Sequence, residues 1–184
     1  VLLALAPVLV IAWWKWERRY AAAGHEPLVD LELFRYRSFR NGLLVAGAAF
    51  MGLTSTFAVV AIFLQTGLGV DALRSGLIGL PNAIVSAFTS IYTVRWVMSH
   101  GRKLVIIALL VLLLGTTSSI GVVWAISALD ISFWWLAATL TLNGAAMGAF
   151  ASANQTLAMQ DIPARHGGTA SGLKQTIERI TTAL

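Results

Sequence analysis

The chain has 184 residues, of which 58% are hydrophobic and 11% are charged, and it contains no cysteine. Soluble domains carry about a quarter charged residues, so the composition argues against a water-soluble globular protein. Without cysteine, disulfides, thiol chemistry and thiolate metal sites are excluded. The formal net charge is +5, and the chain starts and stops within apolar stretches without an initial Met. We therefore expect a fragment of a longer protein.

Long uncharged windows divide the chain into candidate membrane spans. Four windows contain no Asp, Glu, Lys or Arg, namely residues 41–70, 75–94, 104–129 and 131–160. A membrane helix needs about 20 apolar residues, so each window fits one complete span. The sequence predicts an all-α, multi-pass transmembrane bundle at 41–184, with four complete spans and the start of a fifth from about Ala170. Residues 1–14 would be the end of a preceding span.

The basic residues concentrate in alternate connections between these windows. Of the 13 Lys and Arg residues, only Arg74 lies in the connections at 65–75 and 128–131. Short loops rich in Lys and Arg stay in the cytoplasm, so we expect these two connections outside. The other loops should be cytoplasmic, on the inner side of the plasma (inner) membrane: residues 15–40, 95–103 and 160–170.

The long loop at 15–40 contains a segment, PLVDLELFRYRSF at 27–39, in which apolar and charged positions alternate. This pattern suits a short interfacial amphipathic helix on the inner leaflet, with Arg35, Arg37 and Arg40 near lipid phosphates. A plain solvated basic loop is the alternative.

Two of the windows carry polar and aromatic side chains along one helical face, at spacings of three and four residues or their multiples. The sets are Phe50, Thr54, Phe57 and Gln65 on the span at 41–66, and Thr139, Asn143, Phe150 and Asn154 on the span at 132–158. Because an amide is costly against lipid, these faces should line protein or a water-filled cavity suited to an organic solute. The alternative is that the polar groups only hydrogen-bond neighbouring helices.

Small residues and a proline mark expected helix contacts. Gly144 and Gly148 have the GxxxG spacing that lets helix backbones approach closely, and Gly168 and Gly172 repeat it. Pro81 removes a backbone donor in mid-span and should kink its helix. The kink would be either a gating hinge or a static packing bend.

Catalytic and metal-binding patterns are absent from the sequence. It contains no hydrolase, zinc, P-loop or dinucleotide motif, and its three histidines lie far apart in predicted loops. We expect no enzyme activity, no cofactor and no metal site. Topology explains the basic loops without a nucleic-acid partner.

Proton coupling normally uses an intramembrane carboxylate, and the four complete spans contain none. The coupling carboxylate either lies outside this chain or is Glu178, near the start of the last helix. Lys174 stands four residues earlier, so the two side chains could pair. Alternatively, the two charges could simply neutralise each other at the membrane interface, without a role in coupling.

Three segments, in order along the chain, carry a family resemblance: EPLVDLELFRYRSFRNG (26–42), FLQTGLGVDALRSGLIGLP (63–81) and IPARHGGTASGL (162–173). Together they resemble the C-terminal half of the major facilitator superfamily, and more narrowly its fourteen-span drug/proton antiporters. The resemblance covers nearly the whole chain. It implies that 1–14 ends the last of two extra helices between the two bundles.

The resemblance assigns roles to the helices. Spans 41–66 and 132–158 would be the first and fourth helices of the C-terminal bundle, which line the central cavity. The span at 104–129 would be the lipid-facing third helix, in agreement with its all-round apolar sequence. A cytoplasmic loop motif of the family is matched by Arg95, Gly101, Arg102 and Lys103. That motif normally carries an acidic residue, which is absent here, and the position of Lys174 is usually uncharged.

These observations predict a secondary active transporter that exports drug-like or amphipathic organic compounds by alternating access, driven by protons. An importer or a dedicated metabolite exporter of the same superfamily is one alternative. A non-transporting membrane scaffold or sensor is another. The expected partners are the lipid bilayer, a small organic solute, protons, and an N-terminal bundle of the same polypeptide.

Overall fold

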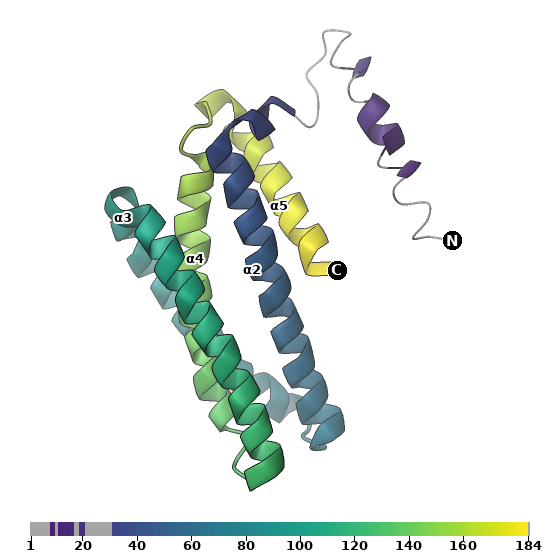
Figure 1. Cartoon of the computed structure of the whole chain (residues 1–184), viewed down its shortest axis with the longest axis vertical. Helices are drawn as coiled ribbons and strands as arrows, with labels where there is room; N and C mark the ends of the chain where they lie inside the picture. Colours follow the sequence, from purple (N-terminus) through teal and green to yellow (C-terminus); the bar gives the residue numbers. More distant parts are fainter. Residues whose placement is uncertain (1–7, 10, 17–18, 21–30, 184) are drawn as a thin grey trace.

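A computed structural model describes residues 8–9, 11–16, 19–20 and 31–183 of the chain, and this part is helical without strands. The elements in order are η1 (Leu31–Arg35), α2 (Arg37–Ile62), η2 (Phe63–Gly67), α3 (Ala72–Leu129), α4 (Trp135–Met159), η3 (Ala164–His166) and α5 (Gly167–Ala183). Figure 1 shows the long helices side by side, which confirms the all-α prediction. Residues 1–7 and 10 of the predicted span at 1–14, and residues 27–30 of the amphipathic segment at 27–39, lie outside the described residues.

The longest helix, α3, is a hairpin of two membrane-length arms. A straight helix of its 58 residues would be about 87 Å long at about 1.5 Å per residue, far more than the ~30 Å hydrocarbon core. At His100 the backbone leaves helical geometry, with φ −135° and ψ 22°, and the chain turns back (Figure 1). We call residues 72–99 the first arm and 101–129 the second arm. With α2 and α4, the arms make four long helical segments, each of which covers most of one charge-free window, and their passage through a membrane stays a prediction.

The helix ends follow from local signals. Asp71 begins α3 because its side chain accepts a hydrogen bond of 2.9 Å from the backbone N–H of Arg74. Asp130 ends the helix in the left-handed conformation at φ 52°. The first arm remains helical through Pro81, and the non-helical residue in α3 is His100. A hinge at Pro81 therefore stays a prediction.

The bundle has two ends of different charge. The turns at 99–103 and 160–166 lie at the same end as the start of α2, and we call this the basic end because it carries most of the Arg and Lys residues of the bundle. The turns at 68–71 and 130–134 lie at the opposite end (Figure 1).

Helix α4 packs tightly against the first arm. A Cβ atom at Gly144 would lie 2.3 Å from the carbonyl oxygen of Asn82, and one at Gly148 would lie 2.2 Å from that of Ser86. The Asn82 side chain donates a 2.6 Å hydrogen bond to the carbonyl of Leu140 on α4. The close backbone approach predicted for this glycine pair is thus confirmed.

The second glycine pair of the same spacing makes no such contact. A Cβ atom at Gly168 or Gly172 would meet no atom within 4 Å in the described part of the chain. The GxxxG spacing on α5 is therefore not used for close packing against the helices that are described.

The second arm shows one narrow buried seam and a broad exposed apolar surface. Its buried residues recur every seven or four positions and face α4, namely Gly101, Ala108, Gly115, Ser119 and Ile126. The large side chains on its other sides, among them Leu110, Leu113 and Ile120, are exposed. This distribution is what a helix facing lipid over most of its circumference requires.

The end of the predicted amphipathic segment, which comprises η1 and the first turn of α2, packs onto the other helices at the basic end. Leu33 and Phe39 are fully buried, where they cluster with Leu43 on α2 and Ala170 on α5. These apolar side chains of the predicted amphipathic segment therefore contact protein. A place for its arginines at lipid phosphates stays a prediction.

Candidate functional site

A cavity of about 350 Å³ lies among α2, the first arm, α4 and α5, and we call it the inner cavity. Its lining residues are Phe50, Ser90, Phe150, Ala151, Ser152, Asn154, Gln155, Lys174, Gln175 and Glu178. Gln155 and Gln175 are exposed, so the cavity opens to the outside of the described bundle. The lining of the inner cavity thus combines two aromatic residues, several amides and hydroxyls, and one ion pair.

The cavity brings together residues predicted from two separate arguments. Phe50, Phe150 and Asn154 come from the polar and aromatic faces of the two cavity-lining spans. Lys174 and Glu178 come from the charged pair near the start of the last helix. All five line the inner cavity.

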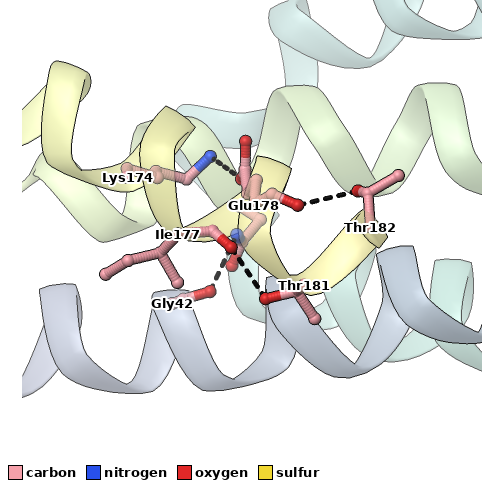
Figure 2. Close-up of polar contacts among 7 residues, drawn as sticks. Gly42, Lys174, Ile177, Glu178, Thr181 and Thr182 are labelled. Carbon is pink, nitrogen blue, oxygen red and sulfur yellow. Dashed lines mark hydrogen bonds and ion pairs between the residues drawn. The ribbon is translucent and has the colours of Figure 1, made fainter. Parts of the chain in front are cut away.

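The ion pair on α5 is the charged part of this wall. The Nζ of Lys174 lies 2.5 Å from Oε1 of Glu178, and the two side chains are only 6% and 16% exposed. Figure 2 shows the pair on one side of α5. The spacing of four residues holds the pair in register on the helix. Gly47 of α2 brings α5 close, since a Cβ there would lie 3.5 Å from Thr181.

Asn154 joins α4 to α2 beside the cavity. Its Nδ2 donates a 3.1 Å hydrogen bond to the carbonyl of Gly42 (Figure 2). A Cβ at Gly42 would lie 2.6 Å from the Cβ of Ala158, so the helices cross tightly here. Asn154 also lines a second cavity of about 450 Å³ at the basic end, with Arg37, Arg102, Asp161 and others. We call this second space the basic-end cavity, and Asn154 belongs to the walls of both.

Two other predicted residues of α4 face the second arm instead. Asn143 is fully buried, and within the described chain neither of its amide atoms has a hydrogen-bond partner. Its Oδ1 would lie 2.2 Å from a Cβ at Gly115, so the glycine makes room for the amide. One turn away, the hydroxyl of Ser119 lies 3.0 Å from that of Thr139. Ser119 and Thr139 thus form a polar contact between the two helices, and neither Thr139 nor Asn143 is among the residues that line the inner cavity.

The remaining predicted residues of α2 are spread along the helix. Thr54 is half-buried, one turn beyond Phe50. Phe57 packs with Val60 and Leu140 in an apolar cluster toward the end opposite the basic end. Gln65 is exposed in the π-helical turn η2 at that end. None of the three lines the inner cavity, so their contact with a solute stays a prediction.

The loop-motif residues lie around the hairpin turn of α3. The Arg95 guanidinium lies 6.0 Å from the Tyr92 ring centroid, and Lys103 is exposed. Gly101 is buried against Leu157 of α4, whose side chain would lie 3.0 Å from a Cβ atom at this position. Arg102 lines the basic-end cavity together with Asp161. Asp161, in the turn after α4, is the acidic residue among those that line this cavity.

Sequence reasoning missed four polar lining residues, namely Ser90, Ser152, Gln155 and Gln175. Ser90, Ser152 and Gln155 lie next to, or within a turn of, other polar residues in an apolar window, and Gln175 follows Lys174. Asn82 was missed too, although an amide beside Pro81 in mid-span needs a partner. Among the residues that the structure describes, no group of three or more His, Asp and Glu side chains could hold a metal ion.

The sequence matches known transporters over its whole length. The profile described as Major Facilitator Superfamily matches residues 1–184. The "Probable actinorhodin transporter" of Streptomyces coelicolor is 26% identical over 98% of this chain and 31% of its own length. The "Lincomycin resistance protein LmrB" of Listeria monocytogenes is 32% identical over 45% of this chain and 17% of its own length.

A third relative, the "Probable transport protein HsrA" of Haemophilus influenzae, is 26% identical over 88% of this chain and 34% of its own length. The chain thus spans about a third or less of these three curated relatives. No solved structure gives a significant match. Because the family profile covers every residue, the conclusion does not depend on any one relative: the chain belongs to the Major Facilitator Superfamily, a family of membrane transporters.

Proposed function

We propose that the full-length protein containing this chain is a secondary transporter that exports amphipathic or cationic organic compounds in exchange for protons. The observation that carries the proposal is the composition of the inner cavity. The half-buried Phe50 ring offers apolar contact, the buried Phe150 lies behind the same wall, and Ser152, Asn154 and Gln155 offer polar groups. Organic ligands bind in sites of this kind, where a few polar groups on an apolar wall orient the solute.

The inner cavity is the part of the solute path that this bundle contributes. The exposed Gln155 and Gln175 would face the other bundle, and rocking of the two bundles would open the path to each side in turn. The basic end would lie in the cytoplasm, because Lys and Arg favour that side. Asn154 borders both the basic-end cavity and the inner cavity, so a solute entering from the cytoplasm would pass it.

The names of two relatives support the proposal that the solute is an organic compound. One relative is named for lincomycin resistance and another for actinorhodin transport. Both names refer to organic compounds, and resistance follows when such a compound leaves the cell. We infer export for this protein on that ground, together with the cavity. A plasma-membrane location is part of the same proposal.

The proposal can be tested by dye accumulation in an efflux-deficient bacterial host that expresses the full-length protein. Cationic and neutral dyes should accumulate less than in the empty host, and a protonophore should abolish the difference. Ser152→Trp, which fills the inner cavity, should restore accumulation. Ser118→Trp is the matched control, because Ser118 is exposed on the second arm. Unchanged accumulation of every dye, with the protein present in the membrane, would contradict export.

A further inference from the structure

The ion pair on α5 is isolated from all other charges in the inner cavity. Lys174 and Glu178 are the only titratable residues among those that line it. The residues that α2, the first arm and α4 contribute to the wall are aromatic, hydroxyl, amide or small. Within the described part of the chain, the Lys174 ammonium donates its hydrogen bond to the Glu178 carboxylate. Each of the two charges is therefore neutralised by the other and by no further charged residue of the cavity lining.

The two partners differ in how easily a solute can reach them. The Glu178 side chain is 16% exposed and that of Lys174 is 6% exposed. A solute in the cavity therefore meets the carboxylate more readily than the ammonium. The half-buried Phe50 lines the same cavity, and an aromatic ring can attract a cation through its π face.

We propose that this pair is the proton/cation exchange site of the transporter, with Lys174 as the group that carries the proton. An organic cation from the cytoplasm would bind the Glu178 carboxylate and displace the ammonium. The displaced ammonium is buried without a counter-ion, which is strongly unfavourable in a membrane protein. Lys174 therefore releases its proton to the cytoplasm and becomes a neutral amine. The inference rests on the proposed function and assigns its coupling step and its substrate class.

The exchange conserves charge and protons. One ammonium–carboxylate pair and one monovalent cation become one amine, one cation–carboxylate pair and one released proton. On the external side, a proton binds the Lys174 amine, the ammonium pairs again with Glu178, and the cation leaves. No other reactant is needed. The mechanism also explains how coupling can occur although the four spans contain no carboxylate.

Binding of an anionic solute would lead to uptake of a proton by the site and not to its release. Its binding to Lys174 would leave Glu178 without a counter-ion, and the carboxylate would take up a proton. Proton and solute would then move in the same direction, which does not use an inward proton gradient for export. The structure therefore favours cations as the cargo.

The test measures proton release from the purified full-length protein in detergent, in weak buffer with a pH-sensitive dye. Tetraphenylphosphonium is the probe. The unaltered protein should release a proton for each cation bound. Lys174→Arg keeps the positive charge, but a guanidinium does not release its proton. This variant should therefore release no proton when the cation binds, and it should bind the cation more weakly than the unaltered protein. Glu178→Gln should weaken cation binding by about tenfold or more.

The matched control is Arg179→Gln, because Arg179 is an exposed charge next to Glu178 in the sequence. It should bind the cation and release protons as the unaltered protein does. Downhill dye transport by Lys174→Arg and Glu178→Gln checks that both variants fold in the membrane. Proton release by Lys174→Arg, per cation bound, equal to that of the unaltered protein would overturn the inference, and so would the absence of cation binding by the unaltered protein.

The outcomes also separate this inference from the proposed function. Protonophore-sensitive dye export without proton release on cation binding would overturn the exchange site and leave export standing. Export of neutral dyes alone would overturn the cation assignment. An absence of any dye export would count against the proposed function, and the exchange site would fall with it.

Discussion

Asn154 on α4 donates a 3.1 Å hydrogen bond to the backbone carbonyl of Gly42 on α2. Within one turn, Ala158 comes so close that a Cβ at Gly42 would lie 2.6 Å from its Cβ. The bond therefore sits at a tight crossing of the two helices, between the basic-end cavity and the inner cavity. A side chain that holds helices together here also borders the proposed solute path.

Replacing Gly42 by alanine should loosen this crossing. The added methyl group meets Ala158, so α2 must shift, and overpacking of this kind costs about 1–3 kcal/mol. Thermal unfolding of the purified protein in detergent should show a lower Tm. Gly52→Ala on the same helix is the control, because a Cβ there meets no atom within 4 Å. Equal Tm values for the two variants would contradict the tight crossing.

Two asparagines on α4 should respond in opposite ways to leucine. Asn143 is buried with both amide atoms unpartnered in the described structure, so Asn143→Leu should stabilise the protein by about 1 kcal/mol. Asn154→Leu removes the bond to Gly42 and should destabilise it by about 1 kcal/mol. The unfolding midpoint of each variant measures the difference. A stability loss for Asn143→Leu as large as that for Asn154→Leu would show that the Asn143 amide has a partner.

The opposite surroundings of these asparagines could not be predicted from the sequence. Thr139, Asn143, Phe150 and Asn154 share one face of α4 because of their spacing, and this much was predicted. Packed helices cross at an angle, so one face meets different neighbours along its length. Asn143 therefore meets Gly115 of the second arm, whereas Asn154 meets Gly42 of α2.

The predictable features are those that depend on local pattern alone. Charge-free windows predicted where the long apolar helices lie, because a helix meant to span a membrane excludes charges over about 20 residues. The spacing of Lys174 and Glu178 predicted their pairing, since residues four apart on a helix are neighbours. The position of this pair in a cavity with Phe50 depends on how α5 packs against α2, which no local pattern encodes. The same holds for Arg102 of the second arm and Asp161 of the turn after α4, which line one cavity.

The glycine contact between α4 and the first arm should be sensitive to a single methyl group. A Cβ at Gly148 would lie 2.2 Å from the carbonyl oxygen of Ser86. Because backbone cannot move aside as a flexible side chain can, Gly148→Ala should lower the unfolding free energy by about 1–3 kcal/mol. Gly121→Ala is the control, since a Cβ there meets no atom within 4 Å. A Gly148→Ala variant as stable as the control would contradict the close approach.

The proposed orientation can be tested by cysteine labelling, because the chain contains no cysteine of its own. Ala72 and Ala164 are both exposed, at opposite ends of the bundle. In intact cells, with any cysteines elsewhere in the full-length protein replaced, Ala72→Cys should react with an impermeant maleimide and Ala164→Cys should react only after lysis. Labelling in the reverse order would place the basic end outside the cell.

The central claim, that the inner cavity is the solute path, is tested most directly by protection of a cysteine within it. Ser152 lines the cavity, and Ala164 is exposed outside it. In membranes containing the full-length protein, a transported cationic dye should slow alkylation of Ser152→Cys and leave Ala164→Cys unaffected. Equal alkylation rates of Ser152→Cys with and without a dye that the same protein exports would contradict the account.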